Sequence, residues 1–417
     1  MLLLGQFVSQ IGTIMQNFAF SLYVLKTTGS GKAFASVLAV QIIPQIFIAP
    51  FSGVLADWFD RKKIIVLLDM LSGALIGGLY LISITVGLQL IHIYIAVALL
   101  TIISTLFYPA IGSMMPAVMK KEELMDANAL NSVAMSSVNI LGPILAGFVF
   151  GFYGIETVLL LNSISFICSA ISEMFINAPK LEKKNEMLGI KQFKEDFIEG
   201  IVFLKDNYIL LLITITAFMM NFIFNPLFSV GLTYISKITL GISDIQYGML
   251  ESIAMVGAIL APIFASIISK RLKLSNIFMY GIFVCVLLLG FMSLDIMPAF
   301  TDLFNNNIVP FTILALTCAL FTLVLTISNL ALMTLQQKIV PLDILGRYYA
   351  VSGAITMGAV PLGQMMFGTL FDKLPSYVVV LIGFSISLIF ILVIAKPFIK
   401  VEERSESSEF EVINAEI

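Results

Sequence analysis

Residues 53–63 read GVLADWFDRKK, a short charged segment between two long apolar runs. The run that leads into it covers residues 33–57, so its end overlaps the segment, and the run that follows covers residues 63–87. Each is long enough to cross the hydrocarbon core of a bilayer, which takes about 20 residues of helix. Apolar runs joined by short charged turns are typical of a helical membrane protein, because hydrocarbon leaves a chain no water with which to satisfy its backbone groups.

The composition of the whole chain agrees with this interpretation. Of 417 residues, 59% are hydrophobic and 12% are charged, whereas a soluble protein averages about 25% charged residues. The mean hydropathy is +1.03. The net charge of −3 provides no basic field for nucleic acid. These values exclude a soluble enzyme, a nucleic-acid-binding protein and a secreted disulfide scaffold.

The three cysteines, Cys168, Cys285 and Cys318, each lie inside an apolar run. We therefore expect buried thiols that pack as small hydrophobic groups. The single histidine, His92, has no neighbouring cluster of metal-ligating residues. The sequence predicts no catalytic residues, no cofactor and no metal.

The apolar runs predict twelve membrane-spanning helices. Their lengths and uniform hydrophobicity do not fit the alternating strands of a membrane barrel. The first run lacks a basic leader and a small-residue cleavage site, so we expect a membrane helix there rather than a signal peptide. The twelve runs cover roughly residues 1–25, 33–57, 63–87, 91–118, 127–151, 156–178, 208–235, 244–269, 275–295, 308–336, 346–370 and 376–396.

The distribution of Lys and Arg predicts the orientation in the membrane. With both termini on the cytoplasmic side, all but four of the 23 basic residues fall in cytoplasmic segments. The four on the outside are Lys26, Lys32, Lys237 and Lys373. Cytoplasmic loops are enriched in positive charge. We therefore expect a multi-pass protein of the cell membrane with two cytoplasmic termini.

One hydrophilic stretch, residues 179–207, divides the chain into two halves. Within it, FKEDFIEGIVFLKDN (193–207) places apolar residues at helical spacing, which predicts an amphipathic helix on the cytoplasmic membrane surface. The predicted domains are a six-helix bundle over 1–178, this linker, and a second six-helix bundle over 208–400. The acidic, Ser-rich tail 401–417 is expected to be disordered.

Several motifs carry a resemblance to a known family. Residues 53–63 resemble the loop signature G-x-L-a-D-r-x-g-r-k of the major facilitator superfamily, with Trp58 and Asp60 as departures from it. The stretch DANALN (126–131) and the pair Gly346-Arg347 are similar to the branch that holds macrolide-efflux proteins and the enterobactin exporter. The resemblance implies an all-α membrane fold of two parallel six-helix repeats, and a monomer.

The resemblance also implies two structural motifs. The loop would act as a cytoplasmic latch near the start of span eleven, formed by Gly53, Asp57, Arg61, Lys62, Gly346 and Arg347. The alternative is that the basic residues of this loop only fix the orientation of the chain in the membrane. In span five, Gly142, Pro143 and Gly147 resemble the G-P-x-x-x-G motif of exporters; physically, the proline removes a backbone donor and bends the helix. The alternative is an ordinary kink.

Three acidic residues lie at membrane depth, where ionisable groups are costly and usually functional. Glu251 lies about 12 Å below the outer surface at 1.5 Å per residue, with no nearby basic residue in the sequence. It is the first candidate for proton coupling, and the alternative is a protonated side chain held by a neighbouring hydroxyl or amide. Asp69 and Glu173 lie near the cytoplasmic ends of their spans and are the other candidates, with structural pairing as their alternative.

Neutral polar residues inside the spans are candidates for a substrate cavity, which the resemblance places along spans one, four, seven and ten. In each case the alternative is hydrogen bonding between helices. The candidates are Gln10, Gln16, Asn17, Gln41, Gln45, Tyr108, Asn221, Asn225, Asn329 and Gln364.

Together these features predict a secondary transporter that exports a hydrophobic or amphipathic small molecule, such as a macrolide-like drug, in exchange for protons. The absence of Lys or Arg deep in the spans favours neutral or cationic cargo over an anionic siderophore. Export of a siderophore or another secreted metabolite, and proton-coupled uptake, are the alternatives. The expected partners are a small-molecule substrate, protons and the lipid bilayer.

Overall fold

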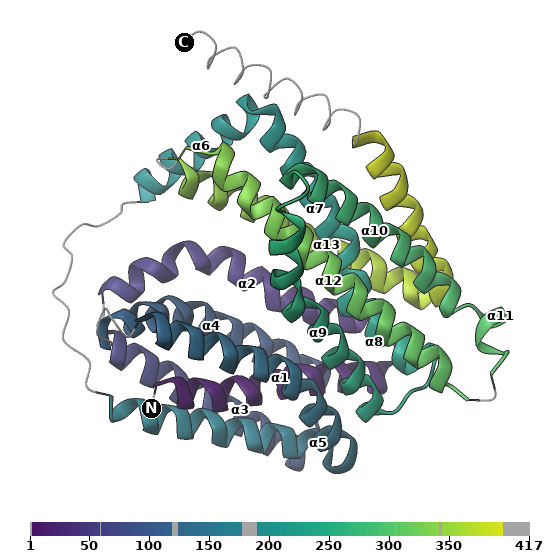
Figure 1. The fold of residues 1–417 in the computed structure, drawn as a ribbon. Coiled ribbons are helices and arrows are strands. Elements are labelled where there is room, and N and C mark those ends of the chain that lie inside the picture. Colours follow the sequence, from purple (N-terminus) through teal and green to yellow (C-terminus); the bar gives the residue numbers. More distant parts are fainter. Residues whose placement is uncertain are drawn as a thin grey trace, which may run out of the picture. The chain divides into compact units, whose positions relative to one another are not determined.

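The computed structural model describes residues 2–58, 60–118, 124–176, 190–304, 306–341 and 344–394. These residues form helices and no strand (Figure 1). In chain order the elements are α1 (Leu2–Thr28), α2 (Gly31–Trp58), α3 (Arg61–Thr85), α4 (Leu90–Val118), α5 (Leu124–Met174), α6 (Ile190–Asp206), α7 (Tyr208–Pro226), η2 (Leu227–Gly231), α8 (Leu232–Tyr234), η3 (Ile235–Thr239), α9 (Asp244–Ile268), α10 (Leu274–Asp295), α11 (Pro298–Thr301), α12 (Ile308–Ile339) and α13 (Leu345–Lys373). A last helix covers Ser376–Ile394.

Ten helices in the described residues are long and apolar enough to span a membrane. One of them, Leu130–Met174, is 45 residues long and belongs to α5, which is interrupted at Gly154 with φ 77° and ψ −178°. Glycine tolerates this conformation because it has no Cβ. The interruption falls between the predicted spans 127–151 and 156–178. The all-helical membrane fold is therefore confirmed, and the count of twelve spans stays a prediction.

The chain forms two compact units. Unit 1 comprises Met1–Leu188 and Leu232–Met255, and unit 2 comprises Gly189–Gly231 and Val256–Ile417. Unit 1 therefore includes a segment from the second half of the sequence. This segment contains α8, η3 and the first half of α9. The tail 401–417 and most of the linker before Ile190 lie outside the described residues.

In unit 1, α5 packs against both α1 and α3, and α4 packs against α2 and α3 (Figure 1). The α3 helix begins after Asp60, whose side chain accepts hydrogen bonds from the backbone N–H groups of Lys62 and Lys63. Such a cap satisfies donors that the first helical turn leaves free. Asp60, noted in the sequence as a departure from the loop signature, thus fixes where this helix starts.

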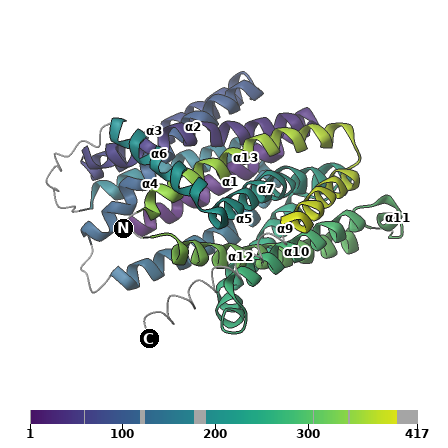
Figure 2. The same ribbon diagram turned by 90° about the horizontal axis from the view of Figure 1, so that it is seen from above.

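In unit 2, α10 runs beside α12, and α13 packs against α6 and α7 (Figure 2). The α7 helix ends at Pro226, and the chain continues directly into the π-helical turn η2. The helix predicted in the linker is α6, and it begins at Ile190. Its Gly200 lies against the backbone of Arg347, where an added Cβ would come within 2.8 Å of the Arg347 carbonyl oxygen.

Candidate functional site

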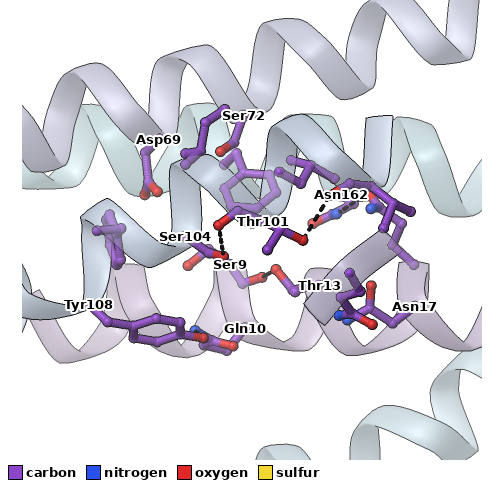
Figure 3. Close-up of a pocket in the computed structure, with 17 residues that line it drawn as sticks. Ser9, Gln10, Thr13, Asn17, Asp69, Ser72, Thr101, Ser104, Tyr108 and Asn162 are labelled. Atoms are coloured by element: carbon purple, nitrogen blue, oxygen red, sulfur yellow. Dashed lines mark hydrogen bonds between the residues drawn. The ribbon is translucent and has the colours of Figure 1, made fainter. Parts of the chain in front are cut away.

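A polar cavity of about 90 Å³ lies within unit 1, between α1, α2, α3, α4 and α5 (Figure 3). At about 30 Å³ per water molecule, it has room for a few waters or a small ion. Its polar lining residues are Ser9, Gln10, Thr13, Gln16, Asn17, Gln41, Asp69, Ser72, Thr101, Ser104, Tyr108 and Asn162. No Lys, Arg or His is among the residues that line it.

The cavity brings together five of the predicted polar residues, namely Gln10, Gln16, Asn17, Gln41 and Tyr108. The Gln10 amide donates to the Tyr108 hydroxyl at 3.2 Å, which joins α1 to α4. A sixth candidate, Gln45, is exposed on α2 and does not line the cavity.

Asn162 is a cavity residue that the sequence reasoning missed. Its side-chain nitrogen donates to Gln16 Oε1 at 2.6 Å, and both residues are buried at 1% exposure. The feature of the sequence that could have indicated it is a polar asparagine within the apolar run 156–178. Its pairing with α1 needed the packing of two helices that are far apart in the sequence.

The hydroxyl groups around the cavity supply it with hydrogen-bond acceptors. Thr13 donates to the Ser9 carbonyl and Thr101 donates to the Val97 carbonyl, each at 2.8 Å within its own helix. Ser104 likewise donates to the Thr101 carbonyl at 3.1 Å. A hydroxyl has one donor and two acceptor lone pairs, so a group that donates locally still offers acceptors to its surroundings. Together with the Asp69 carboxylate, these oxygens favour protons and other cations.

The second polar cluster lies in unit 2 and joins α7, η2 and α13. The Gln364 amide donates to Asn225 Oδ1 at 3.4 Å and to Ser229 Oγ at 3.3 Å. Gln364 is 3% exposed, and its own Oε1 has no hydrogen-bond partner. Two other predicted cavity residues of this half make no hydrogen bond to the cluster in the described structure: Asn221 donates to the Ala217 carbonyl of its own helix, and Asn329 is exposed on α12.

The glycine and proline motif of α5 packs directly on the first half of α9. A Cβ at Gly147 would come within 2.5 Å of the Asp244 carbonyl oxygen, and a Cβ at Gly248 would overlap the Pro143 carbonyl oxygen. Ser252 donates across the same contact to the Ile140 carbonyl at 2.6 Å. The two backbones approach this closely only because glycine lacks a side chain.

Gly142 lies elsewhere in the same unit, against α1. A Cβ there would come within 2.7 Å of Ile14. The three motif residues therefore serve two contacts: Gly142 packs on α1, and Pro143 and Gly147 pack on α9.

Glu251 lies one turn beyond Tyr247 on the part of α9 that belongs to unit 1. The Tyr247 hydroxyl donates to Glu251 Oε1 and is within 2.7 Å of the Thr233 hydroxyl. Phe18 of α1 stacks on the Tyr247 ring at 5.0 Å between centroids. Among the described residues, no ion pair involves Glu251.

Asp244, at the start of α9, forms ion pairs with two lysines. Lys26 of α1 and Lys237 of η3 lie 2.7 and 2.6 Å from its carboxylate. In the sequence these lysines were counted only as markers of topology, and nothing in their spacing predicted a shared partner. Both lysines contact Asp244, whereas the hydrogen-bond partner of Glu251 is the Tyr247 hydroxyl.

The other two acidic candidates, Asp69 on α3 and Glu173 on α5, lie close together. Asp69 is 3% exposed and Glu173 is 1% exposed. The Ser169 hydroxyl donates to Glu173 Oε1 at 3.5 Å. The sequence identified both residues as costly acids but did not predict that they meet.

The residues of the predicted latch are described only in part. The side chains of Gly53, Asp57 and Arg61 lie outside the described part of the structure, whereas Lys62 donates its backbone N–H to Asp60. In unit 2, Arg347 forms an ion pair with Glu199 of α6 at 2.9 Å. The neighbouring Gly346 has open space around it.

Comparison with known proteins identifies the class. The family model described as "transmembrane secretion effector" (MFS_3) matches residues 1–414, so the chain belongs to this family of the major facilitator superfamily. Its members and relatives are membrane transporters and not enzymes. The resemblance inferred from the loop and from span five is therefore confirmed.

Efflux proteins are among the curated relatives. Macrolide efflux protein A of Streptococcus pyogenes is 22% identical over 380 residues, covering 89% of this chain and 88% of the relative. The multidrug efflux pump Tap of Mycobacterium bovis is 23% identical over 368 residues, covering 85% and 82%. The crystal structure of a bacterial homologue of the iron transporter ferroportin, inward-facing, is similar in fold, with a TM-score of 0.71, 17% identity, and coverage of 95% and 97%.

Proposed function

We propose that this chain exports hydrophobic or amphipathic small molecules of the macrolide type in exchange for protons, by alternating access. We further propose that it works as a monomer in the cell membrane, with both termini in the cytoplasm. The chain is a transporter of the major facilitator superfamily with efflux-protein relatives. The cargo, the coupling ion and the transport cycle are the parts proposed.

The observation that carries the proposal is the position of Glu251. It accepts a hydrogen bond from Tyr247, within the stretch of α9 where Gly248 and Ser252 contact α5. A change in the charge of Glu251 changes how strongly the Tyr247 hydroxyl donates to it, and Tyr247 is in turn hydrogen-bonded to Thr233. We therefore propose that binding a proton at Glu251 alters the packing of α9 on α5, which couples the proton to the movement of cargo.

The nature of the cargo is supported by charge and composition. No Lys or Arg is buried in the described residues, so an anionic substrate would lack a counter-charge. The chain has 34 Phe and 21 Met, side chains that suit adaptable apolar contacts. The names of the two efflux relatives support the same class of compound.

The test uses inside-out membrane vesicles with an acidic interior and a dye that reports the internal pH. A macrolide, a lipophilic cationic dye and an anionic siderophore are added separately. We expect the macrolide or the cationic dye to release protons from vesicles that contain the native chain. Glu251→Gln should abolish this release, and Glu156→Gln, which removes a carboxylate elsewhere in unit 1, should leave it unchanged.

Other outcomes would contradict parts of the proposal. Proton release with the siderophore alone would mean that the cargo is an anionic metabolite and not a drug. If release occurred only when a compound was loaded inside the vesicles, the chain would be an uptake permease. If vesicles with Glu251→Gln released protons fully, with unchanged dependence on pH, this residue would have no part in the coupling step.

A further inference from the structure

Asp69 and Glu173 form a buried acidic pair that the proposed export cycle does not use. Asp69 extends from α3 and Glu173 from the last turns of α5, two helices that pack side by side. The Ser169 hydroxyl donates to Glu173 Oε1 at 3.5 Å and also reaches the carboxylate of Asp69. The two carboxylates are close enough to interact electrostatically.

Little in the described structure compensates two negative charges at this place. One oxygen of each carboxylate, Asp69 Oδ2 and Glu173 Oε2, is buried without a hydrogen-bond partner. No ion pair involves either residue among the described positions. Two carboxylates that share a dry site do not both ionise readily, because like charges repel and burial removes the water that would stabilise them.

The surroundings of the pair contain few other ionisable groups. From α4, Tyr108 lines the same cavity as Asp69. From α1, the neighbouring stretch Gly5–Asn17 has no ionisable side chain. On α3 itself, the nearest charged residue in the sequence is Lys63, which is exposed.

The pair lies between an apolar cluster and the polar cavity. The cluster comprises Ile65, Leu68, Phe107, Ala110, Ile111, Met114 and Ile176. It occupies the part of the bundle where α3 begins and where α4 and α5 end. On the other side, Asp69 lines the cavity together with Ser72 and Ser104, and Figure 3 shows its carboxylate directed toward that space. Protons can therefore reach the pair from the cavity, whereas the apolar cluster separates it from the near end of the bundle.

We propose that Asp69 and Glu173 share one proton and form a second proton-binding site, which exchanges its proton with water in the polar cavity of unit 1. The proton is held between a carboxylate oxygen of each residue and leaves to a cavity water as the pair ionises. Ser169 positions the pair by donating to it. The site adds to the proposed proton exchange and rests on that function only for its role in transport.

A proton fits the pair better than a metal ion. A hard cation such as Ca²⁺ takes six to eight oxygen ligands, and no group of three or more His, Cys, Asp or Glu side chains that could hold a metal ion occurs in the described residues. A proton needs only the two oxygens that are present.

The acidic pair is separate from Glu251, and the distance between the two places can be estimated along α1. Gly5 of α1 packs on Ser169, beside the pair, whereas Phe18 stacks on Tyr247, beside Glu251. Thirteen positions along a helix correspond to about 20 Å. Five of the twelve intervening residues of α1 line the polar cavity. Unit 1 thus has acidic groups beside two well-separated positions of α1, with cavity-lining residues between them.

The test detects protonated carboxyl groups directly, without any drug. The purified full-length protein in lipid vesicles is titrated with pH in choline buffer while infrared spectroscopy follows the carboxylic C=O band. We expect the band of the native chain to include two separate steps that decrease as the pH rises. Asp69→Asn and Glu173→Gln should each leave a single step, at a pH between the two steps of the native chain, because the remaining acid no longer has a charged partner. The double variant should remove both steps.

Three further variants control for structural effects. Glu251→Gln and Asp295→Asn remove buried or partly buried acids elsewhere, so both steps of the pair should persist. Ser169→Ala keeps both carboxyl groups and should shift the frequency of the band. Each variant is compared with the native chain by its thermal unfolding temperature, so that a misfolded protein is recognised.

The outcomes separate this inference from the proposed export. If each single variant leaves the other step at its native pH, or if the double variant titrates as the native chain does, the pair holds no shared proton, whatever the protein exports. If Na⁺ in place of choline removes the protonated band at constant pH, the site binds a metal cation and the proposal is wrong. A protein that exports no drug but shows the two steps keeps the shared proton and loses the proposed function.

Discussion

Lys26 of α1 and Asp244 of α9 form an ion pair of 2.7 Å although 218 positions separate them in the sequence. Lys237 of η3 contacts the same carboxylate at 2.6 Å. The group joins the first helix of the chain to a segment from its second half, and both belong to unit 1.

We expect this contact to open and close during transport. A cleavable bifunctional thiol linker that joins cysteines at positions 26 and 244 should therefore stop export, and a reducing agent should restore it. The measurement is drug accumulation in cells that express Lys26→Cys with Asp244→Cys, before and after reduction. The single variants are the controls. Unchanged export with the linker in place would mean that the two residues stay together throughout the cycle.

The close approach of α5 and α9 predicts a sharp difference between two glycines one turn apart. Gly147→Ala places a methyl group 2.5 Å from the Asp244 carbonyl oxygen, and such overpacking typically costs about 1–3 kcal/mol. Gly151→Ala meets its nearest atom at 3.5 Å, an ordinary contact. We expect Gly147→Ala to lower export at least tenfold and Gly151→Ala to be tolerated. Equal activity of the two variants would contradict the packing described.

The hydrogen bond between Asn162 and Gln16 predicts a measurable loss of stability. Asn162→Ala leaves the buried Gln16 Oε1 without its donor, and an interhelical hydrogen bond in a membrane contributes about 0.6 kcal/mol on average, up to about 1.7. We expect the free energy of unfolding to fall by about 1 kcal/mol. Asn17→Ala, at an exposed position on α1, should change it little. Denaturant unfolding in mixed micelles measures both.

The contact of α6 with α13 should depend more on Gly200 than on the ion pair beside it. Glu199 and Arg347 have side chains that are 54% and 37% exposed, and exposed ion pairs contribute about 0–1 kcal/mol. Gly200→Val, however, would push a side chain into the backbone of Arg347. We expect limited proteolysis at residues 179–207 to accelerate in Gly200→Val and to stay near the native rate in Glu199→Gln. The reverse order would show that charge holds α6 in place.

Much of the fold was predictable because it depends on local composition. The apolar runs predicted the helices, and Gly154 interrupts α5 between the two runs 127–151 and 156–178. The family followed from a few spaced residues and is confirmed by the match over residues 1–414. The site was predictable only in part: five of the polar residues named from the sequence line one cavity, whereas Gln45 and Asn329 are exposed.

The sequence by itself determined that this chain is a helical membrane protein, because hydrocarbon imposes long apolar segments that can be read without knowing their neighbours. The transporter class followed from the resemblance of a few motifs to a known family. Only the tertiary structure decided which polar residues meet. Asn162 reaches Gln16, Lys26 reaches Asp244 and Glu173 lies beside Asp69 because of how each helix is rotated and which helix it packs against. Those contacts join distant positions, and in uniformly apolar helices the spacing of hydrophobic residues does not specify which face packs inward.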